Sequence, residues 1–202
     1  MRFSTIYKRF HEAWSHTFNS LYEIPLYNRV KQVVDDVWVT CPDYPDDYNP
    51  RALWLSSETT NIERTVENIA RCIDTYPDVD WLIPIQGHYR KPRSILRSIK
   101  LLDELGVLKR YEYVAVANLC TERRHDIMVK TVNLAHLLLP CKRLHVFGLD
   151  LDVAMKLRGK IFSFDSMAWT FPRKPGRWSC KNQAERIQYF QEYIQKVRRD
   201  GS

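Results

Sequence analysis

Short apolar runs alternate with longer amphipathic stretches over most of the chain. The short runs are rich in β-branched and aromatic residues, and each has about the length of a buried strand. They predict five strands, over residues 37–40, 81–85, 113–116, 144–147 and 161–164.

The longer stretches carry apolar residues at helical spacing, as Ile62, Val66, Ile69 and Ile73 do within one of them. Strand followed by helix, repeated with short links, requires crossover connections, so the pattern predicts a parallel sheet covered by helices. The predicted helices span residues 61–75, 93–105, 122–138, 151–157 and 183–198, and an N-terminal helical segment, 1–36, holds two more, over 2–16 and near 26–34.

The predicted fold class is α/β, and a (β/α) TIM-type barrel is favoured over an open doubly wound sheet. An open nucleotide-binding sheet usually carries a glycine-rich turn after its first strand, whereas this chain has 6 glycines and no GxGxxG or GxxxxGK motif. A complete barrel needs eight strands and about 250 residues. We therefore expect one domain, 1–202, with a barrel that is incomplete or atypical in its N-terminal part and a basic C-terminal segment and helix, 172–202.

The composition is that of a globular protein, with 45% hydrophobic residues. No apolar run approaches the roughly 18 to 20 residues of a membrane span, and the N-terminus lacks the core of a signal peptide. These features favour a cytoplasmic protein with no membrane partner.

The five cysteines lie far apart and form no metal-binding motif, so neither a metal nor another cofactor is expected. Reduced, packed thiols are the simplest interpretation. A disulfide such as Cys41 to Cys120 is the alternative for a hyperthermophilic source.

The net charge is +7, and the surplus is C-terminal, since residues 120–202 hold 16 Lys and Arg against 8 Asp and Glu. Such a bias favours a polyanionic partner, because Lys and Arg neutralise nucleic-acid phosphates. A solvated basic surface is the alternative. The residues expected to contact phosphates are interleaved with Trp178 and are Arg173, Lys174, Arg177, Lys181 and Arg186.

Polar and small residues follow the predicted strands, where parallel α/β folds place their functional groups. Asp165 directly follows the last apolar strand. A carboxylate there is costly to desolvate, so it is either satisfied by nearby hydroxyls such as Ser163 and Ser166 or kept for chemistry. The other candidates after strands one to four are Asp43, Gln86, Gly87, Asn118, Leu119, Phe147 and Gly148.

With these residues in order, the chain resembles the tRNA-guanine transglycosylase superfamily, including phage-type relatives that insert deazaguanine bases into DNA. The resemblance covers roughly residues 36–171. It rests on four steps in the order in which that family has them, namely Gln86-Gly87, Ala117-Asn118-Leu119, Phe147-Gly148 and Phe164-Asp165.

The resemblance implies base exchange on tRNA or DNA with a purine or 7-deazapurine as the second substrate. Asp165 would be the nucleophile that attacks C1′ of a guanosine, as in retaining glycoside transfer. Asp43 would pair with the purine, and Gln86 with the strand-end residues would frame it. Because the nucleotide must leave its stack, Phe147, Phe164 and Trp169 are candidates for stacking.

Two features of that family are missing from this sequence. It lacks the clustered cysteines and histidine of a zinc site, and it lacks an early Asp-Ser-Gly turn that would carry the general acid. A second subunit or a homodimer partner is therefore expected to complete the barrel and the site. The alternative functions are a non-catalytic nucleic-acid or purine-binding protein derived from such an enzyme, and an N-glycosidase-like hydrolase.

Overall fold

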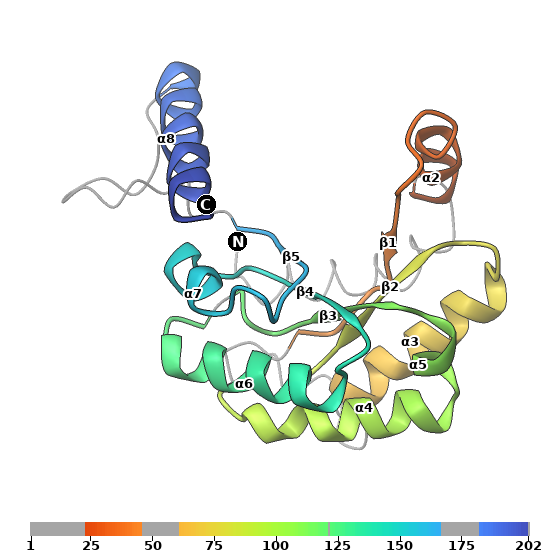
Figure 1. Cartoon of the computed structure of the whole chain (residues 1–202). Helices are drawn as coiled ribbons and strands as arrows, with labels where there is room; N and C mark the ends of the chain where they lie inside the picture. Colours follow the sequence, from red (N-terminus) through yellow and green to blue (C-terminus); the bar gives the residue numbers. More distant parts are fainter. Residues whose placement is uncertain (1–22, 46–60, 121, 167–181, 202) are drawn as a thin grey trace, which may run out of the picture.

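A computed structural model of the chain describes residues 23–45, 61–120, 122–166 and 182–201. It contains a mixed α/β fold in which five parallel strands form one curled sheet, a half-barrel (Figure 1). The predicted parallel sheet is therefore confirmed. In sequence and spatial order the strands are β1 (Val39–Thr40), β2 (Trp81–Ile85), β3 (Tyr113–Val116), β4 (Arg143–Val146) and β5 (Ser163–Phe164).

Helices cover one face of the sheet. The apolar stripe predicted on α3 is buried there, with Ile62 and Ile69 completely inaccessible. Figure 1 shows α3, α4 and α6 packed along the same side of the strands. The helices on this side or at its end are α3 (Asn61–Thr75), η2 (Pro92–Ser94), α4 (Ile95–Glu104), α5 (Val107–Arg110), α6 (His125–Leu138) and α7 (Leu151–Lys156).

The strand register separates two faces of the sheet. Side chains alternate between the faces of a strand, so residues that are paired across neighbouring strands share one face. The rows that face the helices are fully buried and apolar, for example Ile85, Val116 and Val146. The residues that follow this row lie together on the concave face, and they are Gln86, Ala117, Phe147 and Asp165.

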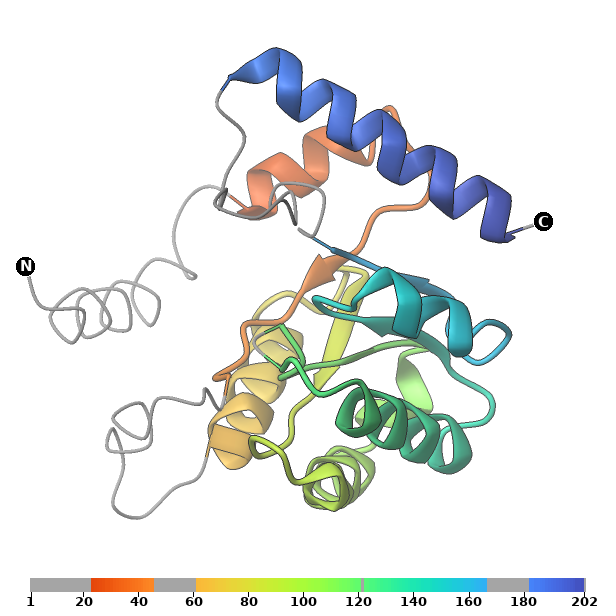
Figure 2. The same ribbon diagram turned by 90° about the vertical axis from the view of Figure 1, so that its left-hand side faces the viewer.

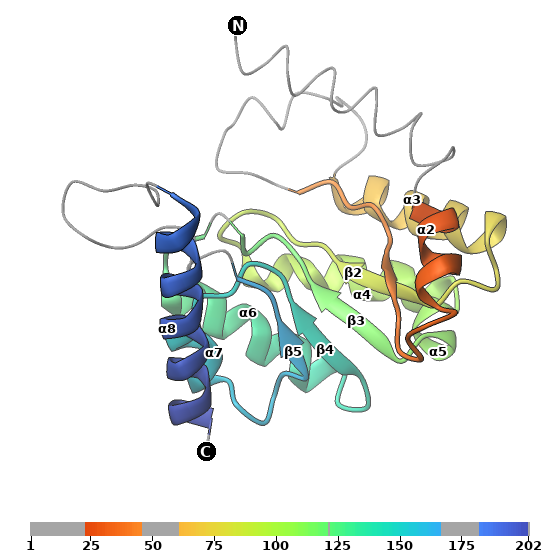
Figure 3. The same ribbon diagram turned by 90° about the horizontal axis from the view of Figure 1, so that it is seen from above.

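Two helices stand on the other side of the sheet from α3, α4 and α6 (Figure 2). They are α2 (Glu23–Val30) and α8 (Gln183–Gly201). Seen from above, α2 stands at the β1 end of the sheet and α8 at the β5 end (Figure 3). An ion pair of 2.7 Å between Lys196 and Asp152 ties α8 to α7. Within the described ranges, no helix has the length and apolar character of a membrane span.

Several boundaries differ from the prediction. The helix over 122–138 begins at His125, because the Glu122 carboxylate accepts the backbone N–H groups of Arg123 and Arg124 ahead of it. The helix over 93–105 is divided into η2 and α4, and Gly106, with φ +72°, starts the unpredicted α5. The N-terminal helix predicted over 2–16 lies outside the described residues.

The cysteines in the described ranges are free thiols. Cys41, at the end of β1, is completely buried, and the thiol of Cys72 on α3 is its neighbour in the core. Burial and this neighbour raise the pKa of Cys41 far above its usual value. Cys41 therefore packs against Cys72, and no disulfide joins it to Cys120.

Candidate active site

Asp165 is the first residue after β5, and 52% of its side chain is open to solvent. Its Oδ1 atom accepts a hydrogen bond of 3.1 Å from the backbone N–H of Gly148 and lies 3.3 Å from Nε2 of His145. Burial acts to raise the pKa of Asp165, but the hydrogen bonds from His145 and Gly148 outweigh it, so this pKa lies below its usual value. Asp165 is therefore an ionised carboxylate at neutral pH.

His145 is held in turn by the neighbouring strand. It is paired with Ser163 in the β4–β5 register, and its Nδ1 atom lies 2.9 Å from the Ser163 hydroxyl. When Nε2 donates to Asp165, Nδ1 of a neutral imidazole accepts from Ser163. The sequence alone gave no signal for this role, because it arises from the pairing of two strands.

Gly148 brings the loops after β3 and β4 together. Its φ is +64°, and a Cβ added there would lie 2.5 Å from Cα of Cys120. Only glycine combines this left-handed backbone with so close an approach. The contact aims the Gly148 N–H at Asp165.

Asp43 lies at the same end of the sheet, in the loop after β1. The loop is anchored on α3, where the Tyr44 N–H donates to Thr65 at 3.0 Å. Burial raises the pKa of Asp43 to about 6, although its own backbone N–H acts in the opposite direction. Burial also raises the pKa of Cys120 to about 11, and the charges of Asp165 and Asp43 add to this shift. Gly148 contacts both Cys120 and Asp165, and Asp43 follows β1 at the same carboxyl edge of the sheet.

Gln86, directly after β2, is completely buried. Its side-chain Nε2 donates to the backbone carbonyl of Tyr44, and its backbone N–H donates to Ser98 at 3.2 Å. Its Oε1 atom, by contrast, accepts no hydrogen bond from any described residue. A buried acceptor without a partner lowers the stability of the fold by about 1–3 kcal/mol. A hydrogen-bond donor on a bound ligand would restore this free energy.

The remaining predicted residues shape the mouth. Asn118 has φ +64°, and its Nδ2 donates to the carbonyl of Gly87 at 3.1 Å, which ties the loops after β2 and β3 together. Leu119 is buried. Phe147 packs its ring against His145, with centroids 4.9 Å apart, while Phe164 packs against the hydrophobic core.

Only one of the five predicted phosphate contacts lies within the described residues. Arg186 is exposed on α8, whereas Arg173, Lys174, Arg177 and Lys181 lie outside the described residues. Trp169 lies outside them as well. Across the described ranges, no three His, Cys, Asp or Glu side chains are placed to hold a metal ion.

Two carboxyl groups with opposite pKa shifts, those of Asp43 and Asp165, follow the two outer strands at the carboxyl edge of the parallel half-barrel. The chain matches no protein-family model, and a search of curated proteins finds no similar sequence. The function is therefore inferred from the residues at this edge of the sheet.

Proposed function

We propose that this protein is a base-exchange transglycosylase acting on guanine or 7-deazaguanine in tRNA or DNA, with Asp165 as nucleophile. The observation that carries the proposal is the state of Asp165. It is a half-exposed, ionised carboxylate, oriented by His145 and Gly148, in the same row of the concave face as the buried Gln86. A nucleophilic carboxylate needs these properties of charge, access and fixed direction.

Asp165 would attack C1′ of the nucleotide. The bond from its carboxylate oxygen to C1′ forms as the C1′–N9 bond breaks, and the electron pair of that bond passes to the departing base. An incoming base then displaces Asp165 from the opposite direction, and its ring N–H proton passes to the carboxylate of Asp43, which has given its own proton to the departing base. Two inversions retain the configuration, as in retaining glycoside transfer.

Asp43 would supply the proton that the departing base requires. With a pKa raised to about 6, its carboxyl group exchanges a proton close to neutral pH. Two carboxyl groups whose pKa values are pushed apart are the usual division between nucleophile and acid. Asp43 would therefore act as the acid while it is protonated, and its ionised carboxylate would accept from the base after the proton has been transferred.

Gln86 would read the base. Its Oε1 atom, which has no partner among the described residues, is free to accept a hydrogen bond from the base. Its Nε2 atom donates to Tyr44, so the direction of the acceptor is fixed. A ring N–H or exocyclic amino group of a purine is a suitable donor. The same atom would discriminate against bases that lack a donor at that position.

The half-barrel would be part of a (β/α) TIM-type barrel whose other strands come from a second subunit or a homodimer partner. In the described part of the chain, β1 and β5 each pair on one side only. Open parallel edges of this kind invite further strands.

A purine-binding protein without catalysis is the second candidate, because the unsatisfied Gln86 acceptor favours a bound base whether or not chemistry follows. Incubation with radiolabelled guanine and, separately, tRNA and duplex DNA distinguishes the candidates. Label incorporated by the wild type and lost in Asp165→Asn supports exchange. Release of guanine without incorporation indicates a hydrolase, and saturable guanine binding with neither reaction indicates the binding protein.

A further inference from the structure

A group of cations outside the proposed mouth lies on two loops at the carboxyl edge of the sheet. The loop after β2 and the start of η2 contribute three, and the segment before α6 contributes two. All five are exposed. We call this group the basic rim, and its members are Arg90, Lys91, Arg93, Arg123 and Arg124.

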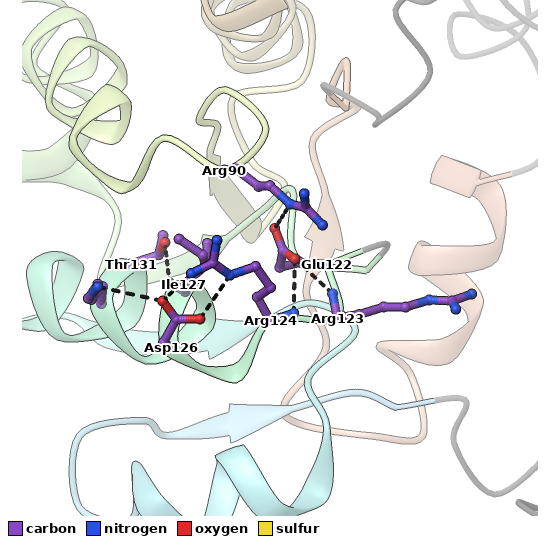
Figure 4. Close-up of polar contacts among 8 residues, drawn as sticks. Arg90, Glu122, Arg123, Arg124, Asp126, Ile127 and Thr131 are labelled. Atoms are coloured by element: carbon purple, nitrogen blue, oxygen red, sulfur yellow. Dashed lines mark hydrogen bonds and ion pairs between the residues drawn. The ribbon is translucent and has the colours of Figure 1, made fainter.

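Glu122 fastens the two loops to each other. Only 1% of its side chain is exposed. Its Oε1 atom accepts the N–H groups of Arg123 and Arg124, each at 2.9 Å, and its Oε2 atom lies 3.4 Å from Nε of Arg90 (Figure 4). A buried carboxylate is costly unless it is paired in this way, so Glu122 fixes the positions of the surrounding cations.

Three cations of the rim are not neutralised by the protein. Arg124 is bound by Asp126 through bonds of 3.1 and 2.9 Å, and Arg90 faces Glu122. Lys91, Arg93 and Arg123, by contrast, have no carboxylate within ion-pair distance in the described part of the chain. Figure 4 shows the Arg123 side chain extended away from Glu122. Uncompensated positive charges of this kind attract a polyanion.

The rim adjoins the predicted base-binding residues. A small hollow between the two loops is lined by Gly87 and Asn118 together with Arg90, Lys91 and Glu122. The bond from Asn118 to the Gly87 carbonyl joins the same two loops. Arg90 also lies over the ring of Tyr89, with 4.9 Å from Cζ to the ring centroid. The surface beside the mouth therefore combines positive charge with an aromatic ring.

We propose that the basic rim binds the phosphates of the nucleic acid whose base enters the mouth. Phosphate contacts fix the position of a nucleic acid without reading its sequence, which suits a rim around a base-reading pocket. The inference rests on the proposed function for the identity of the base. Binding of phosphates by the rim, however, requires no exchange chemistry.

The test compares two triple variants that remove equal charge. The rim variant is Lys91→Ala, Arg93→Ala and Arg123→Ala. The control variant is Arg71→Ala, Lys100→Ala and Lys109→Ala, whose exposed cations lie on α3, α4 and α5 away from the mouth. Fluorescence anisotropy with a labelled tRNA and a labelled duplex DNA measures affinity between 50 and 200 mM salt.

We expect the rim variant to bind at least roughly tenfold more weakly at 50 mM salt, with a salt slope reduced by about 2 to 3, because each phosphate contact contributes about one unit. The control variant should keep the wild-type slope. Equal slopes for the two triple variants would overturn the proposal. Binding to phosphatidylserine vesicles that depends on the rim, without binding to either nucleic acid, would overturn it as well.

A third variant, Glu122→Gln, tests the positioning of the rim. The amide oxygen keeps an acceptor for the two backbone N–H groups, while the charge that faces Arg90 is lost. The variant carries one more net positive charge, so charge alone would raise nucleic-acid affinity. If Glu122 acts by positioning the rim, affinity should instead fall several-fold, with the circular dichroism spectrum unchanged. Free guanine binding, measured by equilibrium dialysis, should be unaffected in the rim variant. Nucleic-acid binding that depends on the rim, without guanine exchange, would contradict the proposed function and still support phosphate binding by the rim. Guanine exchange together with equal salt slopes for the two triple variants would contradict only phosphate binding by the rim.

Discussion

His145 lies across the β4–β5 pairing from Asp165, with its Nε2 atom 3.3 Å from the carboxylate Oδ1. This contact helps to hold the pKa of Asp165 below its usual value against the effect of burial. Its loss in His145→Gln should raise that pKa, so the acid limb of the pH–rate profile should move to higher pH. Asp165 also loses a hydrogen bond that orients it. Because water can partly replace that bond at a half-exposed carboxylate, the rate at pH 7 should fall by about tenfold and not by more.

Ser163→Ala is the matched control, since it removes the outer hydrogen bond of His145 and leaves the inner one in place. It should affect the rate less and leave the acid limb nearly unmoved. An acid limb at the same pH in wild type and His145→Gln would contradict the role assigned to His145.

Gly148→Ala should lower the free energy of unfolding more than Gly106→Ala does. Both glycines have positive φ, at +64° and +72°, so each alanine loses about 1 kcal/mol in backbone energy. At Gly106 nothing lies within 4 Å of the added Cβ, whereas at Gly148 the Cα of Cys120 lies at 2.5 Å. Urea unfolding measures the difference, which we expect to exceed about 1 kcal/mol. Equal losses would show that the close approach of Cys120 is not required.

Asp43→Asn should stabilise the protein at pH 7. The folded protein holds the Asp43 proton up to a pH of about 6, whereas the unfolded chain releases it near 4, so stability falls as pH rises between these values. Removing the charge should restore about 2–3 kcal/mol at pH 7 and flatten this fall. Guanine binding should weaken in the same variant, because the amide offers the base one acceptor oxygen where the carboxylate offers two.

Chemical unfolding at several pH values checks the change at Asp43. Asp126→Asn is the control, since Arg124 holds the pKa of Asp126 below its usual value and the exposed carboxylate carries no burial cost of this size. It should not stabilise the protein at pH 7. A fall in stability for Asp43→Asn would show that its charge is favourable in the folded state.

Gln86→Met tests the buried acceptor. The substitution keeps the side-chain volume and removes both the unsatisfied Oε1 and the donor to Tyr44. Stability without ligand should change by less than about 1.5 kcal/mol, because one deficit disappears as another forms. Guanine affinity should fall by about 10- to 100-fold. Isothermal calorimetry checks it, and unchanged affinity would place the base elsewhere.

Much of the sheet could be predicted from the sequence. β2, β3 and α3 have the predicted bounds, because their apolar runs are buried on the helix-covered side of the sheet and their pattern is complete. β1 and β5 are shorter than predicted, since each pairs with one neighbour only and its apolar run begins before its first paired residue.

The site could be predicted only in part. Residues directly after strands, such as Asp165 and Gln86, follow from the rule that parallel strands end at one edge. His145 and Glu122 do not. The role of His145 depends on its register with Ser163, and Glu122 acts by joining loops that are far apart in sequence. Both roles depend on contacts between residues far apart in the sequence, which the pattern of apolar and polar positions does not reveal.

Identification of the covalent intermediate tests the central role of Asp165 most directly. The wild-type protein is mixed with guanine-containing tRNA or duplex DNA, quenched in denaturant and digested, and the peptides are sequenced by mass spectrometry. We expect a glycosyl ester on the peptide that contains Asp165, with no adduct and no guanine exchange in Asp165→Asn. An adduct on another residue, or exchange that persists in Asp165→Asn, would contradict it.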